Sequence, residues 1–119
     1  MVDENVLEEL RASVEGDTGF VRDLIEAYLV DSAEQLEAIE SAIDATDAEA
    51  LVRPAHTLKS SSATVGAVDV SALARTLEMA GRSGSLDGGE ARGAAEALRG
   101  AMDATATALR AWIAGAEGR

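Results

Sequence analysis

The side chain best suited to chemistry in this sequence is the imidazole of His56, the only histidine among 119 residues. It lies in the segment Ala55–Gly66, which predicts a helix. Helical spacing places one strip of residues beside the imidazole: Val52, Lys59, Ser60, Ala63 and Gly66. The large apolar residues Leu51, Leu58 and Val65 point the opposite way. We therefore expect an exposed strip that presents His56 to another protein.

A neutral imidazole has an ordinary pKa of about 6.5, which makes it a competent nucleophile near neutral pH. Its phosphorylated form is a labile phosphoryl donor. The neighbours of His56 suit a phosphoryl group on the imidazole, because Lys59 can neutralise phosphoryl oxygens. The small residues Ser60, Ala63 and Gly66 leave space for the active site of a partner.

A second helix, predicted over residues 69–82, can add two groups to this site. Glu78 and Arg82 share one face of it, because they are four residues apart. If this helix packs antiparallel against the histidine helix, both residues come near His56. Glu78 then accepts the second imidazole N–H and orients the ring, while Arg82 adds positive charge.

The charge of the chain is strongly acidic but unevenly distributed. There are 22 acidic residues against 10 lysines and arginines, for a net charge of −12. This excess repels nucleic acid and anionic membrane surfaces, so we exclude both as partners. The nineteen residues between Glu49 and Asp69 nevertheless contain no acid, and they include Arg53, His56 and Lys59. The histidine therefore lies in a locally positive segment.

Length and composition indicate a single helical domain over residues 1–119. The absence of cysteine excludes disulfides, thiolate metal sites and thiol nucleophiles. No apolar run approaches the roughly 20 residues of a membrane span, and the Met1 end is acidic rather than basic, so we expect a cytoplasmic protein. Neither a carboxylate cluster around His56 nor a glycine-rich phosphate loop is present, so we expect no metal or cofactor bound by the chain itself.

Apolar spacing and capping residues predict five helices, over about residues 4–13, 18–44, 47–65, 69–82 and 90–114. Asp3 caps the first helix, and Thr46–Glu49 is a capping-box sequence that begins the third. Pro54 lacks the N–H that would bond Ala50, so we expect the third helix to kink or to restart there. The second helix carries a long apolar stripe, which we expect to be buried: Phe20, Leu24, Ile25, Tyr28, Leu29, Leu36, Ile39 and Ile43.

Long amphipathic helices joined by short turns pack most economically as an antiparallel up-down four-helix bundle. The first helix is too short to stand alone, so we expect it to lie across the other four. Each helix has a polar face, and we therefore expect a monomer.

The segment from His56 to Ser62, closed by Gly66, resembles the H-x-L-K-G-S/A-S/A signature of histidine-containing phosphotransfer (HPt) domains. The resemblance covers nearly the whole chain and includes three further segments: Gly16–Phe20, Asp47–Leu51 and Leu77–Arg82. It implies an all-α four-helix bundle with an extra N-terminal helix. It also implies a histidine that accepts a phosphoryl group from the aspartate of one receiver domain and passes it to another. The partners would be response-regulator receiver domains or a histidine kinase, and the receiver would supply Mg²⁺.

By position in the family pattern, His56 matches the phosphorylated histidine, Lys59 the assisting lysine and Gly66 the glycine that keeps the site open. Glu78 matches a position that is often Gln or Glu beside the imidazole, and Arg82 matches a flanking basic residue. The resemblance thus implies a phosphotransfer intermediate that is not itself a kinase.

Ser60 departs from the family pattern, which usually has glycine directly after the lysine. Its hydroxymethyl group lies one turn beyond His56, where it can narrow access or donate a hydrogen bond to a phosphoryl group.

Helical bundles also serve three other functions, which the sequence supports to different degrees. The chain can be the N-terminal phosphoacceptor domain of a chemotaxis-type histidine kinase, fed by a kinase core. It can also be an interaction module that is never phosphorylated, although such a module would be expected to lack His56 or Lys59, and both are present. A ferritin-like metal enzyme needs repeated Glu-x-x-His pairs, which one histidine does not supply.

Overall fold

Helices account for almost all of the chain in the computed structural model, which describes residues 1–118. Five are α-helical and one is a single 3₁₀ turn: α1 (Glu4–Ser13), α2 (Thr18–Asp44), α3 (Ala48–Thr64), α4 (Val68–Ser83), η1 (Asp87–Gly89) and α5 (Glu90–Glu117). These bounds lie close to the predicted ranges, and the largest difference is that α5 continues three residues beyond 114. Among the described residues, no helix has the length and apolar content needed to span a membrane.

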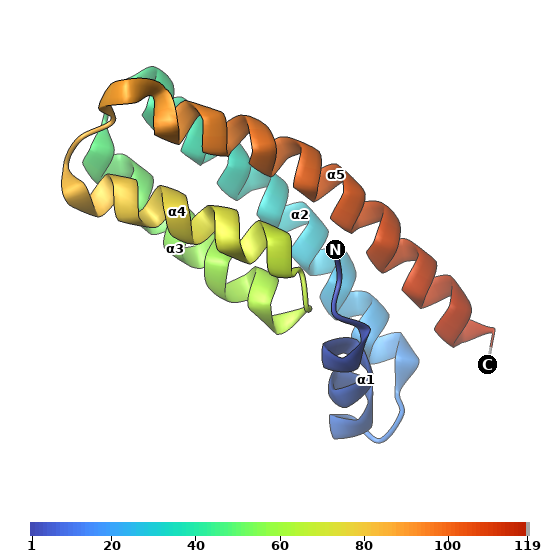
Figure 1. The fold of residues 1–119 in the computed structure, drawn as a ribbon. Helices are drawn as coiled ribbons and strands as arrows, with labels where there is room; N and C mark the ends of the chain where they lie inside the picture. Colours follow the sequence, from blue (N-terminus) through green and yellow to red (C-terminus); the bar gives the residue numbers. More distant parts are fainter. Residues whose placement is uncertain (119) are drawn as a thin grey trace.

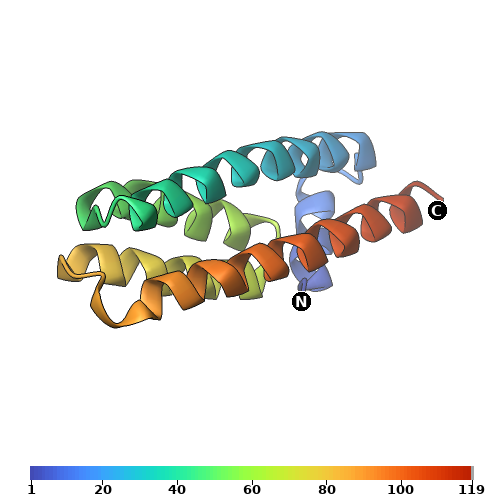
Figure 2. The ribbon, with the colours of Figure 1, turned by 90° about the horizontal axis from the view of Figure 1, so that it is seen from above.

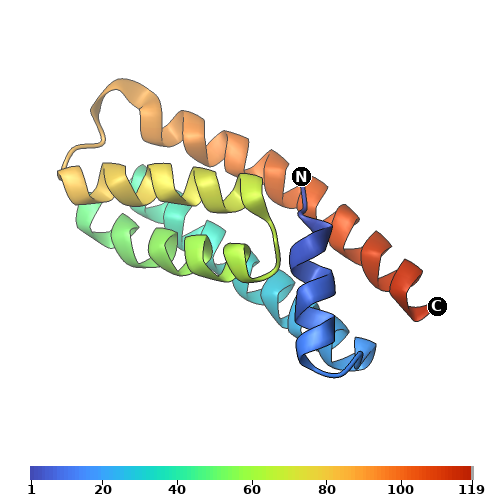
Figure 3. The ribbon, with the colours of Figure 1, turned by 60° about the horizontal axis from the view of Figure 1, so that its bottom comes forward.

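The four long helices form an elongated antiparallel bundle, in which α2, α3, α4 and α5 follow one another around a common core (Figures 1 and 2). The bundle measures 49 × 21 × 20 Å. Helices α3 and α4 are shorter than α2 and α5, and α1 lies across the bundle where the α3–α4 pair ends (Figure 3). The predicted four-helix bundle with an additional short N-terminal helix is therefore confirmed.

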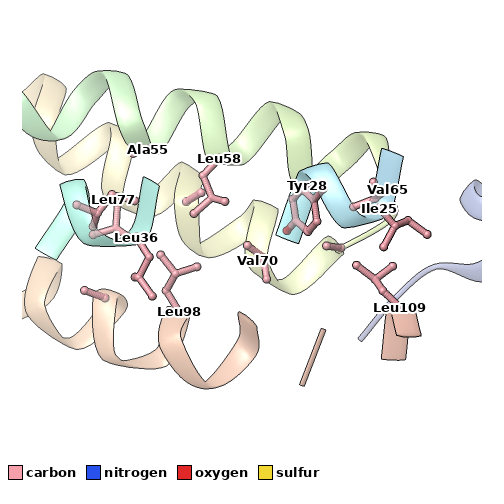
Figure 4. Packing of buried hydrophobic residues seen from close by; sticks show 14 of the residues in the cluster. Ile25, Tyr28, Leu36, Ala55, Leu58, Val65, Val70, Leu77, Leu98 and Leu109 are labelled. Carbon is pink, nitrogen blue, oxygen red and sulfur yellow. The ribbon is translucent and has the colours of Figure 1, made fainter. Parts of the chain in front are cut away.

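The core runs along the axis of the bundle. Figure 4 shows side chains from all four long helices converging there, among them Leu36, Leu58, Leu77 and Leu98. A buried hydrogen bond of 2.7 Å joins the hydroxyl groups of Tyr28 on α2 and Ser62 on α3. Because both hydroxyls are removed from water and satisfy each other, this bond holds α3 in one position against α2.

Three residues of α2 that were predicted to be buried are not: Leu24 and Leu29 are half-buried, and Phe20 is exposed. Phe20 is 51% exposed, whereas its neighbour Val21 is fully buried. The buried stripe of α2 passes through Val21, Ile25 and Tyr28, spaced by four and three residues, and this spacing places Phe20 on the flank of the helix. Sequence periodicity could not assign the first turn, because a shift of one residue fits the remaining apolar positions almost equally well.

Pro54 does not interrupt the third helix. Helix α3 is continuous from Ala48 to Thr64 with Pro54 buried inside it, so the expected restart is wrong. Ala50 is exposed, so water can hydrate the carbonyl group that the proline leaves without an N–H partner. The cap of α3 is Asp47, whose carboxylate accepts the backbone N–H of Ala50 at 3.1 Å, and Thr46 lies outside the helix at φ +52°.

The N-terminal segment is attached to the turn between α3 and α4. Val2 pairs with Ala67 in an isolated antiparallel bridge, and the backbone N–H of Asp3 donates to the carbonyl oxygen of Gly66 at 2.8 Å. The amino group of Met1 forms an ion pair with Asp69. These contacts hold α1 beside the end of the histidine helix, which α1 alone is too short to do.

Candidate functional site

His56 and Glu78 meet across the interface between α3 and α4. The ring nitrogen Nδ1 of His56 lies 3.0 Å from Oε2 of Glu78, although the two residues are 22 positions apart in the chain. The side chain of Glu78 is only 6% exposed, while that of His56 is 54% exposed. The structure therefore places a buried carboxylate beneath a ring that projects into solvent.

Two cations also bind Glu78. Lys59 donates from Nζ to Oε1 at 2.6 Å, and Arg82 donates from Nε and Nη2 to Oε2 at 3.0 and 2.7 Å. The hydrogen bond from Lys59, followed by those from Arg82, lowers the pKa of the Glu78 carboxyl to about 2. Glu78 is thus ionised at neutral pH in spite of its burial.

The charge of Glu78 determines the tautomer of His56. An ionised carboxylate can only accept hydrogen bonds, so the proton of the His56–Glu78 bond must be on Nδ1 of the imidazole. In the neutral ring the other nitrogen, Nε2, then carries a free lone pair. The arrangement produces an exposed ring nucleophile whose orientation is held by a buried acceptor.

The sequence-predicted residues Lys59 and Arg82 are both brought to this site, but their contacts differ from the expectation. Each is paired with Glu78 instead of projecting freely beside His56. The side chain of Lys59 is 31% exposed, so the expectation of an exposed lysine is wrong. The charges of Lys59, Arg82 and Glu78 together leave one net positive charge beside the imidazole.

The expected strip of small residues is only partly exposed. Ser60 and Ala63 are exposed on α3, and Val52 is half-buried. Gly66 is buried and does not belong to the strip, because α3 ends at Thr64 and the helical spacing that placed Gly66 beside His56 no longer applies.

Gly66 has a different structural reason to be glycine. Its φ of +75° lies in the left-handed region, and a Cβ atom there would be 2.6 Å from the carbonyl oxygen of Asp3 and 3.1 Å from Cβ of Val6. The glycine lets the N-terminal segment approach the α3–α4 turn, and it lines the same open groove as Lys59 and Ala63.

Gly81 is a residue that sequence reasoning missed. A Cβ atom at this position would lie 2.9 Å from the carbonyl oxygen of Ala48 and 2.9 Å from Cγ2 of Val52. The missing side chain allows α4 to approach α3 closely one turn from Glu78, so it helps to set the reach of Glu78 to His56. The available signal was a glycine in a helix interior, where it costs about 1 kcal/mol relative to alanine and needs a packing reason.

A hydroxyl group also joins the two helices at the site. Ser71 on α4 donates from Oγ to the backbone carbonyl oxygen of Lys59 at 2.9 Å. This bond fixes the backbone of Lys59 and leaves its long side chain able to move. No pattern in the sequence distinguished Ser71 from the other serines.

An open groove of about 630 Å³ lies beside Lys59, between α1, α3 and α4. Its lining is mostly apolar and includes Val6, Ala63, Val68, Ala72 and Met79. Arg75 also lines it, and the guanidinium of Arg75 has no ion pair or hydrogen bond with another residue of the described chain. No acidic residue is found in this lining within residues 1–118, in a protein whose net charge is −12.

The acidic residues of the described chain do not form a metal site. Within residues 1–118 there is no group of three or more histidine, cysteine, aspartate or glutamate side chains that could hold a metal ion. The carboxylate nearest His56 is that of Glu78, and its oxygens already accept four hydrogen bonds.

Comparison with known proteins gives two matches. A family model described as the Hpt domain matches residues 23–112. The crystal structure of histidine-containing phosphotransfer protein B (HptB) from Pseudomonas aeruginosa PAO1 superimposes with a TM-score of 0.84 and 27% sequence identity, over 94% of this chain and 93% of that chain. No curated protein gives a significant match.

Proposed function

This chain belongs to the Hpt domain family and is a histidine phosphotransfer protein of a phosphorelay, and we propose that His56 is the residue that carries the phosphoryl group. The observation that supports this assignment best is the hydrogen bond between Nδ1 of His56 and Glu78, which in the neutral ring leaves the lone pair of Nε2 free on a side chain that is 54% exposed. The partners that we propose are receiver domains, one that donates the phosphoryl group and one that accepts it.

In the proposed transfer, the lone pair of Nε2 attacks the phosphorus atom of an aspartyl phosphate on the donor receiver. The new bond joins Nε2 to phosphorus, the bond between phosphorus and the aspartyl oxygen breaks, and its electron pair leaves on the aspartate carboxylate. No proton has to move, because Nδ1 keeps its proton throughout. Transfer to the second receiver reverses these bond changes.

Glu78 stabilises the charge that this step creates. A ring that holds a proton on Nδ1 and a phosphoryl group on Nε2 is formally an imidazolium, and the buried carboxylate lies against its protonated edge. A cationic ring is also the better leaving group when the phosphoryl group is passed on. The side chain of Glu78 therefore favours transfer in both directions.

We propose that the Mg²⁺ ion of the reaction is supplied by the receiver. The carboxylate of Glu78 beside His56 is already paired with Lys59 and Arg82. These side chains therefore suit an incoming anion better than a bound metal cation. The local positive charge also complements the acidic, metal-binding site that the family relationship implies for a receiver.

The groove beside Lys59 is the docking surface that we propose for the receiver. Its lining includes Lys59, which is three residues from His56, and exposes apolar side chains such as Met79. It also carries Arg75, whose guanidinium has no partner within residues 1–118. An acidic, partly apolar helix of a receiver would bury this surface while its aspartate faces His56. We propose that the chain acts as a monomer in the cytoplasm, since its helices have polar outer faces and its lack of cysteine suits a reducing compartment.

The test is incubation of the chain with a phosphorylated receiver domain, followed by measurement of intact mass. We expect a gain of one phosphoryl group that is labile in acid and stable in alkali. His56→Ala should remove this adduct, while Thr107→Ala on the exposed face of α5 should keep it. An adduct that persists in His56→Ala, or none with any of several receivers, would overturn the proposal; in the second case labelling by a kinase core would favour the kinase-fed alternative.

A further inference from the structure

The two oxygens of Glu78 are used unequally. Oε1 accepts one hydrogen bond, from Lys59. Oε2 accepts three, one from His56 and two from Arg82. Lys59 can therefore leave Glu78 by breaking one bond, while Arg82 would have to break two.

We propose that Arg82 is a positioning residue that keeps Glu78 paired and so frees Lys59 to turn toward a phosphoryl group on His56. This inference rests on the proposed function, because it concerns the phosphorylated state of His56. Arg82 acts through Glu78 in this account and does not itself touch the phosphoryl group. Lys59 is the cation that changes partner.

The positions of the two cations favour this division. Lys59 is on the same helix as His56, three residues away, so its side chain can reach a group on the outer side of the ring. Its backbone is held by Ser71, which leaves the flexible stem to move. Arg82 follows Glu78 on α4 at a spacing of four, and its planar fork already matches the carboxylate.

Charge supplies the reason for the exchange. A phosphoryl group brings a charge of about −1.5 to −2, which exceeds the single charge of a carboxylate. Lys59 is therefore drawn to it. Without Arg82, movement of Lys59 away from Glu78 would leave the buried carboxylate with no paired cation, which is strongly unfavourable. With Arg82 in place, Glu78 keeps one cation and its bond to His56.

Chemical phosphorylation tests the inference without any protein partner. In phosphoramidate the bond between nitrogen and phosphorus breaks, Nε2 of His56 forms the new bond, and ammonia leaves. The second pKa of the attached phosphoryl group can then be followed by ³¹P NMR. This pKa senses how close a cation lies to the phosphoryl oxygens.

Variants of Lys59, Arg82 and Glu78 distinguish the proposed exchange from direct contact. We expect Lys59→Ala to raise the phosphoryl pKa by about one unit, which corresponds to the loss of one nearby cation at the protein surface. Arg82→Gln should raise it by a similar amount, because Lys59 then stays on Glu78. In a Glu78→Gln background, adding Arg82→Gln should change the phosphoryl pKa much less than it does in the wild type, because Lys59 no longer pairs with a carboxylate there. Arg82→Lys should recover part of the wild-type value.

A full-sized effect of Arg82→Gln in the Glu78→Gln background would overturn the inference, because it would mean that Arg82 acts on the phosphoryl group without Glu78. An unchanged pKa in Arg82→Gln would also overturn it. Arg99→Gln is the matched control, since Arg99 forms a two-bond pair with Glu40 far from His56 and its loss should leave the phosphoryl pKa unchanged. Transfer from receivers is not used, so failure of the receiver assay would reject the proposed function and leave this result standing.

Discussion

Replacing Gly81 by alanine would place a methyl group within the contact between α3 and α4. The new Cβ would lie 2.9 Å from the carbonyl oxygen of Ala48 and 2.9 Å from Cγ2 of Val52. The side chain of Val52 can rotate, but the carbonyl group belongs to the backbone of α3. Relief of the overlap therefore requires α4 to move away from α3, and Glu78 moves with it.

The expected magnitude is a balance of two effects. Overpacking of a well-packed contact costs about 1–3 kcal/mol. Replacing a helix-interior glycine by alanine recovers about 1 kcal/mol of helix propensity. Gly100→Ala isolates the second effect, because Gly100 is exposed within α5 and, apart from its chain neighbours and the nearby backbone of the helix itself, no atom lies within 4 Å of the position that its new Cβ would take. We expect Gly100→Ala to raise the free energy of unfolding by about 1 kcal/mol and Gly81→Ala to lower it by up to about 2 kcal/mol.

Two measurements check this reasoning. Urea unfolding followed by helical circular dichroism gives the difference in free energy of unfolding between Gly81→Ala and Gly100→Ala. The ring ¹⁵N chemical shifts of His56 report whether Nδ1 still donates to Glu78, and we expect them to change in Gly81→Ala only. If Gly81→Ala is as stabilising as Gly100→Ala and the ring shifts are unchanged, close approach at Gly81 does not position the site.

Three further changes follow from the same structure. Glu78 has a folded-state pKa of about 2, below its ordinary 4.5, so its ionised form stabilises the fold above about pH 4.5 and this contribution is lost as pH falls toward 2. The stability gap between wild type and Glu78→Gln in urea unfolding should therefore close over that window, and a gap that stays constant from neutral pH to pH 2 would contradict the pairing. Gly66→Ala should destabilise the fold by at least about 1–2 kcal/mol through its positive φ alone and should speed hydrogen exchange at the Asp3 amide; unchanged protection there would show that the N-terminal segment is held independently of this glycine. Arg75→Glu should slow phosphoryl transfer from a receiver several-fold at low salt and leave labelling by phosphoramidate unchanged. Arg110→Glu, an equal charge reversal on the exposed face of α5, is its control, and equal effects of the two variants would remove the groove as the docking surface.

Much of the helical framework was determined by the sequence alone. Apolar spacing and capping sequences such as Asp3 and Thr46–Glu49 are local features, and they predicted where the helices begin and end to within a few residues, although the cap of α3 is Asp47 and not Thr46. The placement of Lys59 three residues after His56 on one helix is equally local. Such features can be predicted from the sequence, because the interactions that form a helix join residues only a few positions apart.

The errors at Phe20, Pro54 and Gly66 have a different origin. Each depends on what the rest of the chain places next to the residue: which flank of α2 meets the core, what surrounds the proline, and which segment crosses the α3–α4 turn. Helical periodicity describes one helix at a time and contains no information about these neighbours.

The chemical state of the site was decided by tertiary structure. The sequence provided a histidine, a lysine, a glutamate and an arginine, and helical spacing could pair them only within α3 or within α4. Packing of α4 against α3 brings Glu78 beneath His56, which selects the Nδ1 tautomer, and it also commits Lys59 and Arg82 to the carboxylate. Hydrogen bonds and charge compensation act over a few ångströms, so the distance between residues 22 positions apart, which only packing sets, determines which nitrogen is free to react.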